Sequence, residues 1–498
     1  MAKSSDQANS RYLEVERKFE VFESTVSPSF EGLSSVARVE RLPVQQLEAV
    51  YFDTPAHDLA ARRVTLRRRT GGTDAGWHLK LPAGPDARTE VRAPLGDESS
   101  DAVPDELLDV VLAIVRDRPV SPVARISTTR TVDMLYGPDD TAVAEFCDDN
   151  VVARAEDDEA SEQRWREWEL ELAEGGDHDL LDRLTHRLLD AGAAPAGHGS
   201  KLARVLDRED ADGADAVEPP ADPVHRAVAE QVEQLVEWDR AVRADVYDSV
   251  HQMRVTTRKI RSLLQASEGD FGISDDAWVL DELRQLAAVL GVARDAEVLA
   301  ERYEKALDEL PDELVRGPVR ERLVEGAKKH YKSGWRRSLI AMRSQRYFRL
   351  LDALETLATS QPPAAPPGAE QAQLTIDSAY KRVRKAAEKA NAAAETDKDE
   401  ALHRIRKGAK RLRYTASATG AAKVSERAKA IQTLLGDHQD SVVSRTHLVH
   451  EAEAAHAAGE DTFTYGVLYQ QEDDLAQRSR AQVDDALKQL AKAVRKAR

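Results

Sequence analysis

Several features that would narrow the class of protein are missing from this chain of 498 residues. It has a single cysteine, Cys147, so no internal disulfide can form, and this usage fits a reducing cytoplasm. Nothing near Cys147 in the sequence would lower the pKa of its thiol, which favours a small core side chain over a nucleophile. No stretch approaches the roughly 18 uninterrupted apolar residues of a membrane span, and residues 1–11 lack the apolar core of a secretory signal. The sequence therefore predicts a cytoplasmic protein with no membrane partner.

Two catalytic signatures are absent as well. There is no Gly-rich Walker loop, which argues against a P-loop nucleotidase, and no Ser-His-Asp or Cys-His arrangement that would suggest a covalent intermediate. The formal net charge of −18 argues against general nucleic-acid binding. Charge of each sign is nevertheless concentrated in blocks, and two later segments are strongly basic. The average charge therefore leaves room for a local site that takes an anion.

Two breaks divide the chain. Residues 207–222 are acidic, contain Gly and Pro, and are typical of a solvated linker, whereas residues 361–368 form a stiff Pro-rich connector. Before the first break, apolar and charged residues alternate, which predicts antiparallel strands with one charged face. Such strands could form a flat sheet with a wet side, or close into a barrel with the charged face inside. After the break, long runs rich in Ala, Leu, Glu, Arg and Lys predict helices.

The predicted fold class is thus an α+β antiparallel domain followed by an all-α domain. We expect the first domain over residues 10–206 and the second over residues 223–498. The all-α domain divides into two halves, about 223–360 and 371–498.

The two helical halves share a repeated pattern. In each, a His is followed by cations three, seven and ten residues later, and the offset between the halves is constant at 152 residues (403 − 251). The pattern consists of His251, Arg254, Arg258 and Arg261 in the first half, and of His403, Arg406, Lys410 and Arg413 in the second. A Leu-Gly-x-x-x-Asp element follows each, at 290–295 and 435–440. A duplicated helical unit is the simplest account.

Residues with this spacing lie along one stripe of a helix, where like charges repel. An anion on the stripe would relieve that repulsion, because Arg grips phosphate oxygens bidentately while Lys and His add charge and donors. A solvated face paired with acidic neighbours is the alternative, and the recurrence of the pattern in both halves favours the anion. No second His or carboxylate lies at ligand spacing beside His251 or His403, which disfavours a metal there.

This repeat resembles the CHAD family (conserved histidine α-helical domain) over about residues 222–498. The resemblance implies a pseudo-twofold helical bundle with a basic central groove, and it makes inorganic polyphosphate the expected partner of the eight stripe residues. It also implies polyphosphate granules as a location within the cytoplasm. One departure is Lys410, where the family pattern has Arg, so the charge is kept and the bidentate fork is lost.

The N-terminal part carries both signs of charge on its predicted strands. The carboxylates that share strand faces are Glu14, Glu16, Glu167, Glu169 and Glu171, and the cations are Lys18, Arg67, Arg69, Lys80, Arg88 and Arg92. Clustered carboxylates favour hard divalent cations such as Mg²⁺ or Mn²⁺. A cavity with carboxylates on one side and cations on the other suits a metal-chelated triphosphate. A solvent face with cross-strand ion pairs is the alternative.

These strands resemble the CYTH family, the triphosphate tunnel metalloenzymes, over about residues 10–206. The match rests on the segments 14–18, 51–54, 66–69, 77–82 and 169–171. The resemblance implies an antiparallel tunnel with charged residues inside. Family members include inorganic, thiamine and RNA triphosphatases and class IV adenylyl cyclases.

The resemblance also assigns roles to residues of this chain. The implied metal ligands are Glu14, Glu16, Glu169 and Glu171, with Asp149 preferred to Asp148 because it alternates onto the face of Glu145. The implied catalytic and phosphate-binding cations are Lys18, Arg67, Arg69, Lys80, Arg130 and Lys201. Glu90 and Arg92 are further tunnel residues, and Arg125 is the alternative to Arg130.

Three functions follow from these resemblances. The first is Mg²⁺- or Mn²⁺-dependent hydrolysis of inorganic tripolyphosphate or short polyphosphate, with the helical domain binding polyphosphate. The second is an adenylyl cyclase, for which no sequence feature supplies an adenine pocket. The third is a non-catalytic polyphosphate-binding protein associated with granules. Triphosphate and polyphosphate are the expected partners, no specific nucleic acid is expected, and the oligomeric state stays open.

Overall fold

The computed structural model describes residues 11–84, 86–96, 102–156, 162–206, 222–266, 271, 273, 277–359, 376–394 and 397–497. The predicted acidic linker, apart from Asp222, and the predicted Pro-rich connector lie outside the described residues. Among the described residues, no helix is long and apolar enough to cross a membrane.

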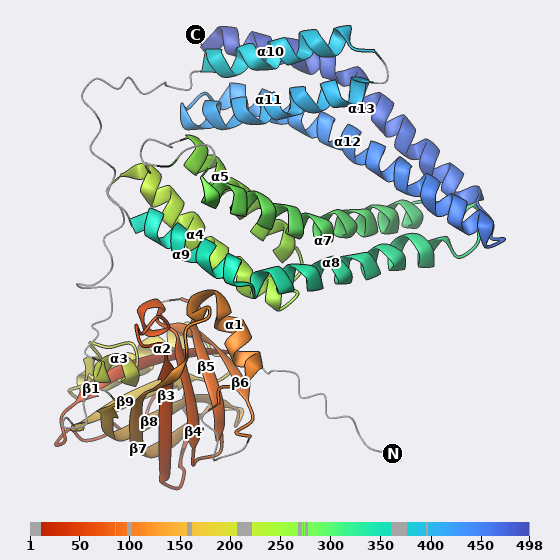
Figure 1. Ribbon diagram of the computed structural model, residues 1–498. Helices are drawn as coiled ribbons and strands as arrows, with labels where there is room; N and C mark the ends of the chain where they lie inside the picture. The colour runs from red at the N-terminus through yellow and green to blue at the C-terminus, as the bar shows by residue number, and fades with distance from the viewer. Residues whose placement is uncertain are drawn as a thin grey trace, which may run out of the picture. The chain divides into compact units, whose positions relative to one another are not determined.

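The N-terminal part is a closed antiparallel barrel (Figure 1). Its strands pair in the order β1-β6-β5-β4-β3-β7-β8-β9, and pairing of β9 with β1 closes the ring. The ring strands are β1 (Arg11–Val21), β3 (Gln45–Asp53), β4 (Thr65–Thr70), β5 (Gly76–Pro82), β6 (Ala87–Ala93), β7 (Ser121–Tyr136), β8 (Ala142–Ala155) and β9 (Glu162–Leu172). Two short strands add to it, β2 (Arg38–Arg41) beside β7 and β10 (Ala194–Pro195) beside β1. Of the two arrangements that the alternation allowed, the chain adopts the barrel.

The outer face of the barrel is partly covered by helix α2 (His178–Asp190). Its buried residues Leu180, Leu184 and Leu188 belong to one core with Trp168 and Leu170 of β9. Since neighbouring residues of a strand point to opposite faces, this apolar outer core sends the alternating residues of β9 into the barrel. Because α2 covers the apolar outer face of β9, the charged face of this strand points into the barrel.

A short helix, α3 (Lys201–Val205), packs at one end of the barrel. Leu202 and Val205 are buried against Tyr51, Ile126 and Val151, residues that share the inward strand faces. Two other short elements belong to this part, η1 (Ala60–Arg62) and α1 (Asp105–Val115). Apolar contacts of one face of α3 thus fix it at the end of the barrel.

The C-terminal part is all-helical, as predicted (Figure 1). Its helices are α4 (Pro223–Arg243), α5 (Ser249–Ala266), α7 (Trp278–Asp308), α8 (Gly326–Met342), α9 (Gln345–Thr359), α10 (Ile376–Ala392), α11 (Lys398–Ala418), α12 (Ala422–Ala457) and α13 (Phe463–Ala497). The turns η2 (Asp312–Leu314) and η3 (Glu321–Glu325) lie between α7 and α8. The two predicted His-containing repeats fall on α5 and α11, and the two Leu-Gly elements fall on α7 and α12.

Contacts group the chain into two compact units, residues 1–287 with 339–362, and residues 288–338 with 363–498. In the second unit, one core joins Val383, Leu412 and Ile431 of α10, α11 and α12. Close packing in this unit is visible at Gly334, where an added Cβ would lie 2.7 Å from the backbone nitrogen of Ala293. The division passes through α7 and α8, and the predicted boundaries at residues 206 and 223 stay predictions.

Candidate functional site

A cavity of about 310 Å³ runs inside the barrel. Its walls come mostly from inward-facing residues of the strands, together with Leu42, Thr73, Asp74 and the segment that leads into α3. Its charged lining residues are Glu14, Glu16, Lys18, Arg67, Arg69, Asp74, Lys80, Arg88, Glu90, Arg92, Arg130, Glu145, Glu169, Glu171 and Lys201. A barrel interior of this composition is a polar chamber rather than a packed core.

Strand register explains which side chains meet. On β1, Glu16 lies opposite Glu171 of β9 and Lys18 lies opposite Glu169. Lys18 Nζ donates to Glu169 Oε1 at 2.5 Å and to Glu16 Oε2 at 3.0 Å. Burial alone would lower the pKa of Lys18, but the charges of Glu16 and Glu169 raise it, so this ammonium stays charged between two strands.

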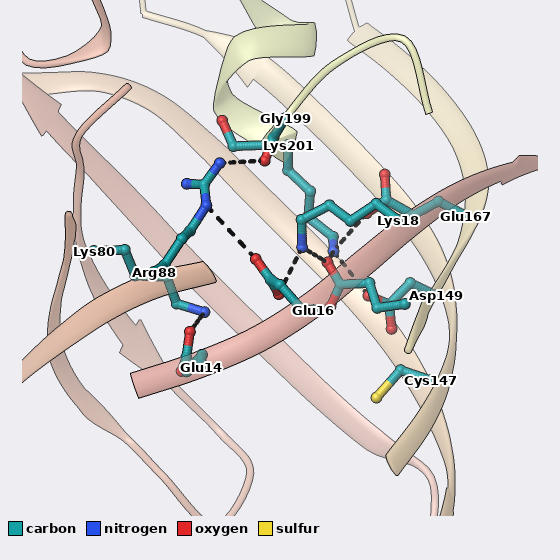
Figure 2. Close-up of polar contacts among 12 residues, drawn as sticks. Glu14, Glu16, Lys18, Lys80, Arg88, Cys147, Asp149, Glu167, Gly199 and Lys201 are labelled. Carbon is teal, nitrogen blue, oxygen red and sulfur yellow. Dashed lines mark hydrogen bonds and ion pairs between the residues drawn. The ribbon is translucent and has the colours of Figure 1, made fainter. Parts of the chain in front are cut away.

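Three buried carboxylates gather around the ammonium of Lys201 (Figure 2). We call Asp149, Glu167 and Glu169 the Lys201 triad. Lys201 Nζ lies 2.9 Å from Asp149 Oδ2, 2.7 Å from Glu167 Oε1 and 2.7 Å from Glu169 Oε1. Arg130 Nε donates to Asp149 at 2.8 Å, and Arg130 also contacts Glu169. Burial works to raise the pKa of Asp149, but the charges of Lys201 and Arg130 hold it below its usual range.

A second set of carboxylates lies in the same cavity. We call Glu14, Glu16, Glu145 and Glu171 the open acidic group. Burial raises the pKa of Glu171 to about 7, with Glu14 adding to the rise, and burial also raises the pKa of Glu14. Glu16 differs: burial works to raise its pKa, but the charges of Lys18 and Lys80 together lower it to about 2. Lys80 Nζ reaches Glu14 at 2.5 Å, but no ion pair in the described chain involves Glu145 or Glu171. Arg88 and Arg92 also approach Glu16 and Glu14, at 3.8 and 3.7 Å, so Glu145 and Glu171 are the two members of this group without an ion pair among the described residues.

Geometry and charge favour different carboxylates as the metal seat. Among the described residues, the Lys201 triad is the group whose ligand atoms all lie within 4.8 Å of one another. Those oxygens already face Lys201 and Arg130, whereas Glu145 and Glu171 of the open acidic group have no ion pair among the described residues. Charge therefore favours the open acidic group, because unscreened like-charged carboxylates spread apart until a cation draws them together. Hard oxygen donors in this number fit Mg²⁺ or Mn²⁺.

Across the cavity the lining is mostly cationic. Arg67 Nη1 donates to the hydroxyl of Tyr51 at 3.3 Å, and Arg69 contacts Asp74. Burial and the charges of Arg67 and Arg130 lower the pKa of Arg69 to about 9, so these guanidiniums are held close together against their repulsion. A polyanion between them would remove that repulsion.

A fully buried His–Glu pair supports the cationic wall. His78 Nδ1 lies 2.7 Å from Glu90 Oε1, and Glu90 also contacts Arg92. Burial lowers the pKa of His78 to about 4, even though the hydrogen bond to Glu90 works against that fall. Its other nitrogen contacts the backbone oxygen of Asp74 at 2.9 Å, which fixes the ring and with it the position of Glu90.

All the predicted tunnel residues except Asp149 and Arg125 line the cavity. Asp149 is buried directly behind the wall in the Lys201 triad, whereas Asp148 points to the other face and pairs with Arg166 at 2.6 Å. Arg125 also lies on the other face and pairs with Glu156 at 2.6 Å. It stands five residues before the inward Arg130 with no bulge between, so strand alternation turns it outward.

The structure brings four further residues to this site; sequence reasoning named Arg88 and Glu167 only as members of charged strand faces and gave the other two no role. The four are Tyr51, Arg88, Glu145 and Glu167. Arg88 Nη2 donates to the backbone oxygen of Gly199 at 2.6 Å and so holds the segment before α3 (Figure 2). Alternation from Glu90 gives the face of Arg88, and alternation from Glu169 gives that of Glu167, but it gives no information on partners across the barrel.

The predicted basic stripes are each a coherent helix face. On α5 the four stripe residues are all half-buried, whereas Lys259 beside them is exposed. The same holds on α11, where Arg404, Lys407 and Arg411 are exposed and the stripe residues are half-buried. Arg413 Nη1 donates to Gln432 at 3.0 Å, and a Cβ added to Gly436 would lie 3.4 Å from Arg406 Nη2. The Gly of the second Leu-Gly element thus leaves room for an Arg of the stripe.

Comparison with known proteins agrees with this architecture of a charged tunnel and a helical repeat. The CYTH domain model matches residues 13–198 and the CHAD domain model matches residues 226–449. This chain belongs to the proteins in which a CYTH domain precedes a CHAD domain. It is 67% identical over 98% of both chains to the uncharacterized proteins MT2285 and Rv2226 of Mycobacterium tuberculosis, strains CDC 1551 / Oshkosh and ATCC 25618 / H37Rv.

Solved structures also resemble the chain. PptA from Streptomyces chartreusis is 20% identical, with 54% of this chain and 100% of that chain covered and a TM-score of 0.44. The CHAD domain from the plant Ricinus communis is 23% identical, with 54% of this chain and 92% of that chain covered and a TM-score of 0.41. The family assignment rests on the domain models and not on these two scores.

Proposed function

We propose that the barrel hydrolyses the terminal phosphoanhydride of inorganic tripolyphosphate or short polyphosphate with Mg²⁺ or Mn²⁺, and that the helical domain binds inorganic polyphosphate. The observation that carries this proposal is that the carboxylates of one cavity lie mostly on the neighbouring strands β8, β9 and β1, whereas its cations lie mostly on β6, β5, β4 and β7. A metal-chelated triphosphate presents both charges at once, so it needs both sides. Association with polyphosphate granules would follow from the helical domain.

Different residues of the cavity would have different roles in this reaction. Arg67, Arg69, Arg88 and Lys80 would hold phosphate oxygens, since guanidinium groups grip them bidentately. The open acidic group would hold the divalent cation, which when bound supplies charge neutralisation and lowers the pKa of a water. Arg130 and Lys18, both buried and charged, would stabilise negative charge that develops on the transferred phosphoryl group.

The test of the tunnel is phosphate release from purified full-length chain. We expect release from tripolyphosphate with Mg²⁺ or Mn²⁺, and its loss by at least about 100-fold in Glu16→Gln, since electrostatic contributions of this kind have that size. Glu20→Gln is the matched control, because Glu20 lies on the same strand outside the cavity lining and its side chain is 44% exposed. Full activity in Glu16→Gln would show that the metal assignment is wrong.

A substrate panel separates the rival functions. Tripolyphosphate, ATP, thiamine triphosphate and long polyphosphate are each compared with both metals. Cyclic AMP formed from ATP would identify a cyclase instead. Tight binding of tripolyphosphate with no release under either metal would leave a binding protein and would refute the hydrolase.

The helical proposal has its own matched variants. Arg254→Glu with Arg406→Glu reverses one charge on each stripe, whereas Lys259→Glu with Arg404→Glu makes the same change of charge at exposed positions of the same helices. We expect the stripe pair to lose retention of polyphosphate by about 10-fold or more, and the control pair to lose much less, because an aligned stripe contacts one chain of phosphates at several points. Equal losses in both pairs would refute binding on the stripes.

A further inference from the structure

The position of Lys201 has a consequence for how many metal ions the tunnel takes. We propose that the ammonium of Lys201 occupies the position of a second cation, so that the tunnel holds a single divalent ion, at the open acidic group. This inference rests on the proposed metal-dependent function. It concerns the number and place of the ions and not the rate of the reaction.

The contacts of Lys201 are those of a bound cation. Its nitrogen lies between 2.7 and 2.9 Å from one oxygen of each member of the Lys201 triad (Figure 2). An ammonium has three donors, and three carboxylates surround it. The same three carboxylates are the described group that is compact enough to hold a metal ion. One set of oxygens therefore has two candidate cations, and the chain supplies one of them itself.

The backbone keeps this ammonium in place. Lys201 is the first residue of α3, and the hydroxyl of Ser200 accepts a hydrogen bond from the backbone nitrogen of Ala203 at 3.0 Å. Leu202 is 1% exposed and belongs to the apolar core at that end of the barrel. Arg88 donates a hydrogen bond to the backbone oxygen of Gly199, two residues before Lys201. Because the helix start is fixed on both sides, the side chain is positioned with little loss of entropy on binding its partners.

Charge balance separates the two acidic groups. Asp149, Glu167 and Glu169 face three cations, since Lys18 and Arg130 contact this triad in addition to Lys201. A divalent ion added there would meet repulsion from all three. In the open acidic group, cations pair with Glu14 and Glu16 alone, and no ion pair among the described residues involves Glu145 or Glu171. A divalent ion therefore gains most at the open group and little at the triad.

The test counts Mn²⁺ ions bound to the full-length chain, without substrate, by the electron paramagnetic resonance signal of free Mn²⁺. Tight sites are those that fill when Mn²⁺ is close to the protein concentration. We expect one tight site in the unchanged chain and two in Lys201→Met, where the triad becomes available. Arg69→Met removes the same charge from the same cavity without touching the triad, so it should keep one site. Two sites in the unchanged chain, one in Lys201→Met, or two in Arg69→Met would each overturn the proposal.

Loss of Lys201 leaves buried carboxylates without their main partner and can unfold the barrel. The double variant Asp149→Asn with Lys201→Met removes one carboxylate with the ammonium, so it should fold and return to one tight site. In addition, the melting temperature of Lys201→Met should rise with Mn²⁺ by more than that of the unchanged chain, because metal that binds only the folded state stabilises it. An equal rise in both would refute the second position.

Failure of the proposed function gives a different result. If the chain releases no phosphate from any triphosphate but binds one Mn²⁺, and Lys201→Met binds two, the hydrolase proposal is wrong and the cation proposal stands. If hydrolysis occurs and the unchanged chain binds two ions, the reverse holds.

Discussion

The tunnel and the helical stripes hold similar cations in opposite surroundings. Inside the barrel, the side chains of Lys18, Lys201 and Arg130 are at most 15% exposed and each contacts at least one carboxylate. On α11, the stripe is half-buried and of one sign, and the burial of His403 together with the charges of Lys407 and Arg406 lowers its pKa. A metal-chelated ligand needs both signs of charge, whereas a bare polyanion needs only cations. The barrel therefore suits a phosphate chain that carries a metal ion, whereas the stripes suit a phosphate chain without one.

Chelation should separate the two regions most strongly. Removal of divalent ions with EDTA should abolish phosphate release by the barrel, because the proposed reaction needs the metal ion to neutralise charge and to lower the pKa of a water. Retention of polyphosphate by the helical stripes should persist, since their cations need no metal. Release and retention are measured on the same sample before and after EDTA, and again after Mn²⁺ is restored. Phosphate release that survives chelation would contradict the metal requirement.

Removal of one carboxylate from the Lys201 triad should destabilise the barrel. Asp149→Ala leaves Arg130 and Lys201 buried with less compensation, and breaking a buried ion pair in this way costs about 3–5 kcal/mol. Asp148→Ala is the comparison, because Asp148 pairs with Arg166 on the outer face. The measurement is the melting temperature of each variant. A smaller loss in Asp149→Ala than in Asp148→Ala would contradict this account of the triad.

A higher salt concentration should weaken binding to the helical stripes more than binding in the barrel. Raising salt from about 50 to about 200 mM should weaken polyphosphate binding by roughly 100-fold if about four cations contact the chain, since counterions then compete. The Michaelis constant for tripolyphosphate should change less, because buried pairs are screened less than exposed ones. Equal salt dependence of both would show that the two regions bind in the same way.

The smallest expected effect is a dependence of the free energy of unfolding on pH, which comes from the open acidic group. Glu171 has a pKa of about 7 in the folded chain against 4.5 for the free side chain, so the folded chain holds a proton that the unfolded chain has lost. In EDTA, the free energy of unfolding should therefore fall as pH rises from about 4.5 to about 7, by on the order of 1–3 kcal/mol.

Glu171→Gln should remove this part of the pH dependence and be the more stable form at pH 8. Thermal melts of the metal-free variant and of Glu20→Gln at pH 5 and pH 8 provide the measurement. An identical pH dependence in the two variants would mean that Glu171 is not the group that titrates.

Some of the site was within reach of sequence reasoning. Alternation around Glu14, Arg67 and Glu169 gives the charged face of each strand, and the spacing from His403 to Arg413 gives the stripe of a helix. Alternation also excludes Arg125, because it lies an odd number of residues from Arg130 on an unbroken strand. The contacts of each charged side chain could not be predicted from the sequence, since they depend on the register between strands.

The sequence by itself determined the periodicities: strands with one charged face, two helical repeats with aligned cations, and a break between them. Those follow from local geometry, since the side-chain period of a strand or a helix is a property of the backbone. Only the tertiary structure decided that the strands close into a ring, that Lys201 enters the barrel from α3, and that the carboxylates divide into a balanced triad and an open group. These depend on contacts between residues far apart in the chain, such as Lys201 with Asp149, and no local pattern encodes such distances.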